Sequence, residues 1–302
     1  MLQWVASDGV AFNTWEGGAP VTRVVRNAGS TSLEGHTCAV SGCGTLALGY
    51  SFTRLRRGAA AYGYWDGLVP GTDDEAAPVD DGLLMTELST GRRRLVTSLA
   101  ELASGVGSAF GGYHFVTHAT FNPSVTRLAC YHRWKTSDGL LRTHLRIATV
   151  DGVDVLVAPV ANPSHYCWDS DDAVGITDSD SGGACYSHWD LGTKVATAIM
   201  PIALPDDGHP QRSPVEPWRM VTDTYPNRFR RQSLLLVDRR TGGVRYILEE
   251  HVGLSFRGER RCDYHPRWSP DGRQVCVDTA GTGIRSLAIL DLTAVLASLS
   301  TP

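Results

Sequence analysis

Residues 268–279 read WSPDGRQVCVDT, and residues 284–292 continue as IRSLAILDL. A Ser-Pro-Asp-Gly turn before a run rich in β-branched residues, followed by a second run that ends near an acidic residue, predicts two adjacent antiparallel strands. The same order recurs in FNPSVTRLACYHRW with HLRIATVDG (121–134 and 144–152), VTDTYP with SLLLVDRRTGG (221–226 and 233–243), and CAVSGCGTLALGYSF with LLMTELSTGRRRL (38–52 and 83–95). Such repetition is typical of an all-β fold, a β-propeller of four-stranded blades.

Four histidines occupy the same position of this repeat. Each begins a pattern of His-x-x, a fourth residue that is aromatic in three copies, and then Asn, Asp or Ser. The copies are THATFNPS at His118, SHYCWDSD at His165, GHPQRSPV at His209 and YHPRWSPD at His265. Successive copies lie 47, 44 and 56 residues apart, close to the length of a blade. If each copy opens the innermost strand of its blade, the four imidazoles gather on one rim of the central channel.

This gathering predicts a metal site. Two or three neutral imidazoles with an aspartate can bind a divalent ion. Asp263 lies two residues before His265, and therefore on the same side of an extended strand. The adjacent Cys262 would favour zinc if its thiolate took part. The alternative is that the repeat histidines only hydrogen-bond backbone between blades.

The composition excludes several classes of protein. The chain has 302 residues, 42% of them hydrophobic and 20% charged, which is enough apolar material for a core. A net charge of -4 gives no electrostatic case for binding nucleic acid. No apolar run reaches the roughly 18 residues of a membrane span. Seven cysteines without a CxxC pair, and an N-terminus (MLQWVASDG) without signal-peptide features, favour a cytoplasmic location. Export stays open if a leader is missing.

The repeats organise the chain as a single propeller domain over residues 1–302. Five units are recognisable, and an N-terminal fragment, LQWVASDGVAFNTW, is interpreted as the tail of another blade. Because a propeller closes by pairing its first and last blades, an upstream portion is expected to be missing. A Gly/Pro/Asp-rich excursion at 58–82 is expected to be a long loop over a binding face. No helix longer than a turn or two is predicted.

Two further positions suit acid–base chemistry. A histidine beside an arginine, His132 and Arg133, can remove a proton next to a carboxylate that the arginine neutralises. The alternative is a partly buried rim histidine beside a surface arginine. Tyr225 is a candidate acid or sugar-stacking residue; the alternative is a tyrosine packed at a blade turn before Pro226.

Several stretches resemble bacterial propeller proteins related to the oligogalacturonate lyases, and more loosely the Tol-Pal-type propellers. They are GHP (208–210), RCDYHPRWSPDG (261–272), HRW (132–134), SHYCW (164–168) and DTYP (223–226). The resemblance covers roughly residues 1–295, and 261–272 is its most specific part. It implies a seven-bladed propeller, of which this chain would hold about six blades.

The resemblance also implies a chemistry. Oligogalacturonate lyases bind manganese or a similar ion through histidines and a glutamine, and cleave uronic-acid oligosaccharides by β-elimination. By motif, His165 and His265 resemble family metal histidines, and His132 resembles the general base. In the Gln-x-x-His-x-His signature, however, Asp263 replaces a histidine and Arg260 replaces the glutamine. Arginine cannot bind a metal, so the metal set must differ or be incomplete. Propeller ulvan lyases, in which His and Tyr act as base and acid, resemble the chain more loosely.

The sequence therefore supports a lyase hypothesis, in which the chain cleaves uronate-containing oligosaccharides. The expected metal is manganese, with zinc or calcium as alternatives. The metal ligands would be His165, His209, Asp263 and His265, and the catalytic residues would be His132, Arg133, Tyr225 and His118. The competing hypotheses are a non-catalytic scaffold that binds sugar or protein, and a fragment without a closed ring. The sugar and the oligomeric state are left open.

Overall fold

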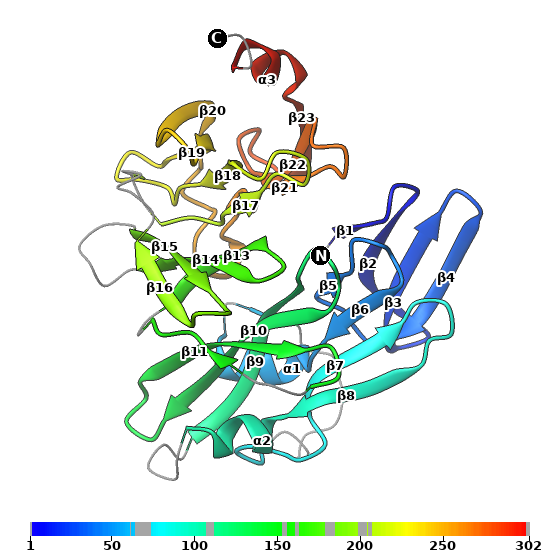
Figure 1. Ribbon diagram of the computed structural model, residues 1–302. Helices are drawn as coiled ribbons and strands as arrows, with labels where there is room; N and C mark the ends of the chain where they lie inside the picture. Colours follow the sequence, from blue (N-terminus) through cyan, green and yellow to red (C-terminus); the bar gives the residue numbers. More distant parts are fainter. Residues whose placement is uncertain are drawn as a thin grey trace. The chain divides into compact units, whose positions relative to one another are not determined.

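The computed structural model describes residues 2–299, apart from 61, 64–73, 107–111, 153–155, 161–162, 179–184, 199–203 and 205–206. Within these residues the chain is mostly β, with six antiparallel sheets that follow one another along the sequence (Figure 1). In every sheet each strand pairs with its neighbour in sequence. This is the strand order of propeller blades, so the predicted fold class is confirmed.

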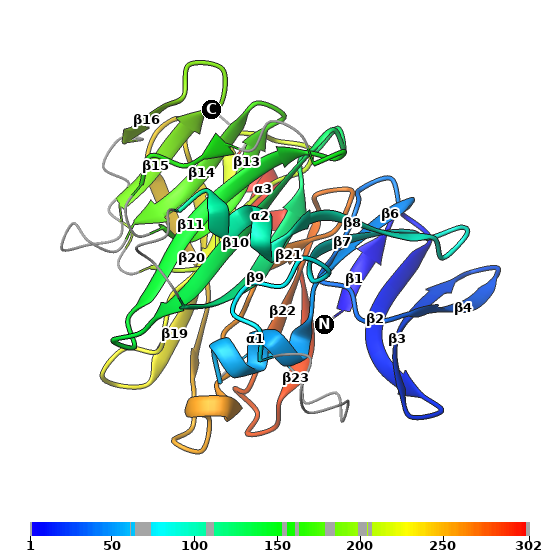
Figure 2. The same cartoon turned by 90° about the horizontal axis from the view of Figure 1, so that it is seen from below.

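The chain divides into two compact units, 1–161 and 162–302, each with three sheets (Figures 1 and 2). The strands of unit 1 are β1 (Leu2–Val5), β2 (Gly9–Glu16), β3 (Ala19–Arg26) and β4 (Gly29–Glu34); β5 (Ala39–Val40), β6 (Leu46–Gly49), β7 (Gly82–Glu87) and β8 (Arg93–Ser98); and β9 (Gly112–Phe121), β10 (Arg127–Thr136), β11 (Leu141–Thr149) and β12 (Leu156–Val157).

Unit 2 holds two sheets of four strands and one of three among the described residues. They are β13 (Pro163–Ser170), β14 (Ala173–Asp178), β15 (Cys185–Asp190) and β16 (Val195–Ala198); β17 (Gln211–Arg212), β18 (Arg219–Asp223), β19 (Arg231–Asp238) and β20 (Gly243–His251); and β21 (Arg267–Trp268), β22 (Gln274–Thr279) and β23 (Ser286–Asp291).

The N-terminal stretch is a complete sheet, β1 to β4, and the prediction that it is only the tail of a blade is wrong. The reason lies in its outer strand. β4 buries only Leu33 among its six residues, so its sequence has none of the apolar periodicity by which a strand is recognised.

In the described part of the chain, three short α-helices accompany the sheets: α1 (Phe52–Gly58), α2 (Leu99–Ser104) and α3 (Thr293–Leu299). α1 was not expected; it begins at the Ser51 side chain, which accepts the backbone N–H of Arg54. Residues 64–73 of the predicted long loop lie outside the described residues. No described helix is long and apolar enough to cross a membrane.

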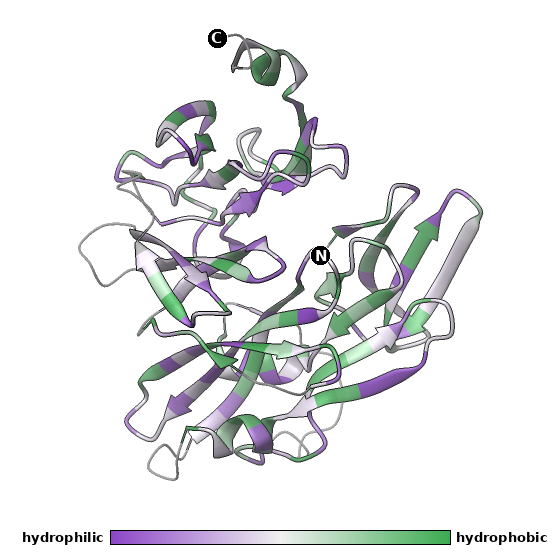
Figure 3. Cartoon of the chain, viewed as in Figure 1, coloured by the Kyte–Doolittle hydropathy of each residue, from purple (hydrophilic) through white to green (hydrophobic). Residues whose placement is uncertain are grey.

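The core of unit 2 lies between successive sheets. The run 234–237 of β19 is buried along its whole length, as its continuous apolar sequence predicts. Leu235 packs in one cluster with Tyr186 of β15, whereas Leu236 packs in another with Val275 of β22. An outer strand such as β20 instead mixes apolar and charged residues, visible as green and purple bands in Figure 3.

Each repeat histidine lies at the first strand of its sheet. His118 and His165 lie within β9 and β13, and His209 and His265 each lie two residues before β17 and β21. This confirms the predicted position of the histidines in the repeat. As a result, the three histidines of unit 2 lie at equivalent points of successive sheets.

Candidate metal and acid–base site

Three of the four repeat histidines gather in unit 2. The ring centroids of His165 and His209 are 4.3 Å apart, and those of His209 and His265 are 4.0 Å apart. All three side chains are partly buried. Residues that are 44 and 56 positions apart in sequence thus form one continuous imidazole cluster.

The three imidazoles are anchored in the same way, through Nδ1. Nδ1 of His165 lies 3.2 Å from Oδ1 of Asp207, and Nδ1 of His209 lies 2.9 Å from Oδ1 of Asp223. Nδ1 of His265 lies 3.1 Å from the backbone oxygen of Asp263. Because each Nδ1–H donates to an oxygen, the lone pair of each neutral ring is on Nε2. This is the arrangement that orients histidines as metal ligands.

Asp263 completes a compact set of donors. The ligand atoms of His209, Asp263 and His265 all lie within 4.8 Å of one another. Oδ2 of Asp263 accepts from Nε of Arg261 at 2.7 Å, whereas its Oδ1 is buried and has no hydrogen-bond partner among the described residues. A divalent ion would satisfy that oxygen, so these residues fit a metal.

Burial decides the protonation of two of the rings. Burial lowers the pKa of His165, and burial with the neighbouring His209 lowers the pKa of His265 to about 4. Both rings are therefore neutral at pH 7, as a metal ligand or a general base must be. Burial also raises the pKa of Asp263, more than the nearby Arg261 lowers it.

His209 behaves differently because of Asp223. Burial would lower its pKa, but the Asp223 carboxylate outweighs that effect and the net pKa is raised. Burial likewise opposes ionisation of Asp223, yet His209 brings the net pKa of this carboxyl below its usual value. Asp223 is therefore a buried, ionised carboxylate that lies next to His209.

A second chain of contacts runs from Asp207 through His165 to Tyr225. The Tyr225 hydroxyl lies 3.4 Å from Nε2 of His165. Asp207 also accepts from the Ser164 hydroxyl, and although burial alone would raise its pKa, contact with His165 lowers it to about 2. The Arg261 guanidinium lies over the Tyr225 ring, 5.0 Å from its centroid. This is a carboxylate-oriented histidine beside a phenol, an arrangement suited to proton transfer.

Backbone geometry brings these side chains together. A Cβ at position 208 would lie 1.8 Å from the backbone oxygen of Asp223, so only glycine lets the His209 segment approach β18. His265 adopts a positive φ of 41°, a conformation that is costly for histidine and recurs at functional sites. The glycine of the Gly-His-Pro stretch thus has a local structural reason.

The structure brings together five of the eight sequence-predicted site residues in unit 2: His165, His209, Asp263, His265 and Tyr225. Two oxygen donors of the site, Asp207 and Asp223, were missed. Their signal is weak, because an aspartate in a loop or at a strand end has many roles. Cys262, a possible extra ligand, is fully buried and outside the compact set.

The other three predicted residues belong to unit 1. His118 packs edge-on against Tyr131, with ring centroids 5.5 Å apart, and the Arg133 guanidinium lies 5.0 Å from the centroid of that same tyrosine. His132 is 0% exposed, its Nε2 lies 2.9 Å from Nδ1 of His114, and burial with the charge of Arg146 lowers its pKa to about 2. Because this imidazole is a very weak base and is fully buried, the structure argues against the predicted role of His132 as the general base.

No protein-family model matches the chain, and no curated protein is similar to it in sequence. Solved structures resemble it in fold. An oligogalacturonate lyase in complex with manganese aligns with a TM-score of 0.62 at 15% identity, covering 94% of this chain and 74% of that one. The oligogalacturonate lyase of Vibrio parahaemolyticus aligns with a TM-score of 0.64 at 11% identity, covering 96% and 76%.

TolB from Acinetobacter baumannii is similar as well, with a TM-score of 0.60 at 13% identity; 97% of this chain spans 63% of that protein. The predicted relation to oligogalacturonate lyases and TolB-like propellers is therefore confirmed as a similarity of fold. At such identities the likeness establishes the β-propeller alone, and any activity has to be argued from the residues.

Proposed function

We propose that the chain is a metal-dependent carbon–oxygen lyase that cleaves uronate-containing oligosaccharides by β-elimination. The observation that carries the proposal is the common anchoring of three imidazoles through Nδ1, next to a buried aspartate oxygen without a partner. The fold is compatible with this class of reaction, because an oligogalacturonate lyase in complex with manganese shares it.

The metal would be held by His209, Asp263 and His265, with His165 beside them. Imidazole and carboxylate donors suit manganese or zinc; an all-oxygen set, which calcium prefers, is absent from the described residues of this cluster. When bound, such an ion supplies positive charge to the uronate carboxylate, which makes the neighbouring C5 proton more acidic.

The proton transfers fall to His165 and Tyr225. The neutral Nε2 of His165 removes the C5 proton, and Asp207 stabilises the resulting imidazolium through Nδ1–H. The electron pair of that C–H bond forms the C4–C5 double bond as the C4–O bond breaks. Tyr225 gives its hydroxyl proton to the departing glycosidic oxygen. The 3.4 Å contact between the two side chains then returns the proton from His165 to Tyr225.

Arg261 has a supporting role in this scheme. Its guanidinium contacts the carboxylate of Asp263 and the face of Tyr225, so it lies between the metal donors and the acid. A guanidinium in that position can hold a carboxylate of the substrate by paired hydrogen bonds while the Tyr225 hydroxyl reaches the leaving oxygen.

The test is a lyase assay with purified chain on several uronate oligosaccharides, with and without added manganese. We expect an unsaturated product, detected by its ultraviolet absorbance, in the presence of metal and its loss in His265→Ala. His251→Ala, an exposed histidine on β20, is the matched control and should retain full activity. The absence of product from every oligosaccharide at every metal concentration would overturn the proposal.

A non-catalytic binding scaffold is the second candidate, because the chain is as similar in fold to TolB as to the lyases. This scaffold hypothesis is compatible with either a stoichiometric metal or no metal. It predicts no unsaturated product, and no activity difference between His265→Ala and the control. The same assay therefore distinguishes the two functions.

A further inference from the structure

A pocket rich in arginine lies beside the cluster. Its volume is about 430 Å³, within the range of sites that hold small ligands. Four of its eight lining residues are arginines, Arg228, Arg230, Arg257 and Arg261, and none is acidic. The chain as a whole carries a net charge of -4, so this local concentration of positive charge is not a consequence of composition.

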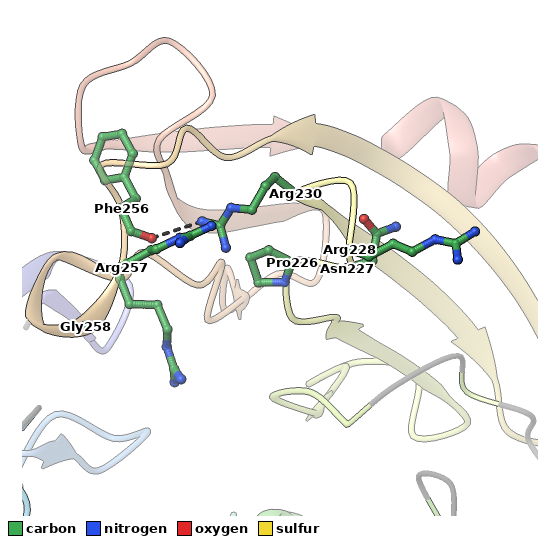
Figure 4. Close-up of a pocket in the computed structure, with 8 residues that line it drawn as sticks. Pro226, Asn227, Arg228, Arg230, Phe256, Arg257 and Gly258 are labelled. Atoms are coloured by element: carbon green, nitrogen blue, oxygen red, sulfur yellow. Dashed lines mark hydrogen bonds between the residues drawn. The ribbon is translucent and has the colours of Figure 1, made fainter.

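One of the four arginines builds the pocket. Arg230 follows a turn at the start of β19 and has a positive φ of 62°. Its guanidinium donates to the backbone oxygen of Val252 at 3.1 Å. It also donates to the backbone oxygen of Phe256 at 3.0 Å (Figure 4). These bonds hold the loop after β20 against the turn, so Arg230 fixes the wall from which Arg257 projects.

Two arginines are available to a ligand. Arg228 and Arg257 are exposed, and neither has a carboxylate partner among the described residues. Arg228 stacks on the Phe229 ring, 4.7 Å from its centroid. Its turn is ordered by Asn227, whose Oδ1 accepts the backbone N–H of Phe229 at 2.9 Å and of Arg231 at 3.1 Å. Figure 4 shows Arg228 and Arg257 extending from opposite sides of Pro226.

The fourth arginine joins the pocket to the metal donors. Arg261 lines the pocket and also pairs with Asp263. Tyr225, the proposed acid, is followed directly by Pro226 of the pocket wall. A molecule with one end at Asp263 and Tyr225 can therefore continue into the pocket without leaving unit 2.

The lining defines the chemistry of the ligand. Guanidinium groups bind carboxylates by paired, charge-assisted hydrogen bonds. Phe256 and Pro226 add apolar surfaces of the kind that pack against the face of a sugar ring. The combination fits an acidic sugar unit better than a free inorganic anion, which would use only the charge.

We infer that this pocket is a subsite for a second acidic sugar of the substrate, with Arg228 and Arg257 as specificity-determining residues. The inference rests on the proposed lyase function, because the first acidic sugar is the one at the metal donors. It assigns to the chain a substrate that carries carboxylates on neighbouring sugar units.

The test compares Arg228→Gln/Arg257→Gln with the control Arg245→Gln/Arg273→Gln, which removes two exposed positive charges elsewhere in unit 2. The ligands are a uronic-acid trisaccharide, the single uronic acid, and inorganic phosphate as a competitor. Calorimetry gives Kd, and initial rates with manganese give kcat and KM. Because both arginines are exposed, the variants should fold; Arg257→Lys, which keeps the charge and loses the paired geometry, is an independent second variant.

We expect the Kd and KM of the trisaccharide to rise about tenfold in the pocket variant, with kcat unchanged, because the lost contacts bind substrate and transition state alike. Binding of the single uronic acid should not change. Arg257→Lys should weaken the trisaccharide by about threefold. The trisaccharide could also bind in a way that depends on the two arginines while no unsaturated product forms. That result would contradict the lyase proposal and still support the subsite.

Three results would overturn the inference. In the first, product forms normally and the pocket variant equals its control, which leaves the lyase proposal intact. In the second, the single uronic acid loses as much affinity as the trisaccharide, which means that the arginines act only through general charge. In the third, inorganic phosphate displaces the trisaccharide at phosphate concentrations near the Kd of phosphate, which identifies a general anion site.

Discussion

Asp223 turns both carboxylate oxygens toward Nδ1 of His209, at 2.9 Å and 3.0 Å. The same carboxylate accepts the backbone N–H of His209 at 2.7 Å and that of His265 at 3.1 Å. One buried side chain thus holds two of the three clustered histidines, one through its ring and both through their backbone. Its place in the cluster is that of a positioning residue beneath the metal donors.

Asp223→Asn should therefore weaken metal binding. An amide keeps the size of the side chain but loses the negative charge that raises the pKa of His209. We expect the Kd for manganese or zinc, measured by calorimetry, to rise by about 10- to 100-fold. Asp238→Asn, which alters a surface pair with Arg240, is the control. Equal metal affinities of Asp223→Asn and Asp238→Asn would show that Asp223 does not support the metal site.

Tyr225→Phe should separate catalysis from metal binding. The change removes only the hydroxyl that lies 3.4 Å from Nε2 of His165. We expect kcat for the unsaturated product to fall by about 100- to 10,000-fold, the range for loss of a general acid, with an unchanged metal Kd. Asp207→Asn should lower kcat less, because it removes the support of His165 and leaves both reacting groups. If both variants keep wild-type kcat, the acid–base chain has no role in the reaction.

The sequence predicted the cluster through its repeat and missed what supports it. His209 and His265 were identified because each repeat places its histidine at the first strand of a sheet, and Asp263 because it lies two residues before His265. Asp223 and Asp207 could not be, since their contacts depend on how one segment approaches another. Gly208 is the residue whose identity reflects this approach, because the Asp223 backbone oxygen leaves no room there for a Cβ.

Strand geometry argues against the interpretation of His132 and Arg133 as a catalytic pair. Adjacent residues of a strand project to opposite faces of the sheet. On β10, His132 faces His114 and is fully buried, whereas Arg133 lies over Tyr131 and is partly exposed. The two side chains therefore lie on opposite faces of β10, which does not favour their acting together on one substrate carboxylate and its neighbouring proton.

Leu235→Ala should test the packing of β19. Leu235 is 0% exposed and packs with Tyr186 and Met220 on one face of its sheet. We expect the free energy of unfolding, measured with urea, to fall by about 2–5 kcal/mol. Leu254→Ala, at a leucine that is 65% exposed, should change it by less than about 0.5 kcal/mol. Similar small effects at both positions would contradict burial of the 234–237 run between sheets.

His188 should make stability depend on pH. Its Nδ1 lies 2.8 Å from Oδ2 of Asp169, a buried carboxylate that also pairs with Arg239 at 2.7 Å. The hydrogen bond to Asp169 raises the pKa of His188 more than burial lowers it. A pKa raised in the folded state means that the protonated ring stabilises the fold; this contribution is complete below the unfolded pKa of about 6.5 and is lost as the pH rises through the folded pKa.

His188→Gln should remove that dependence. Urea unfolding of wild type and variant at about pH 5.5 and about pH 8.5, on either side of the histidine transition, gives two differences in the free energy of unfolding. We expect wild type to be more stable by up to about 1 kcal/mol at the lower pH, a small value because the ring is about one-third exposed, and the difference to shrink at the higher pH. His251→Gln, an exposed histidine, should show no such trend. A difference that grows with pH would mean that the neutral ring, and not the imidazolium, is the form that Asp169 holds.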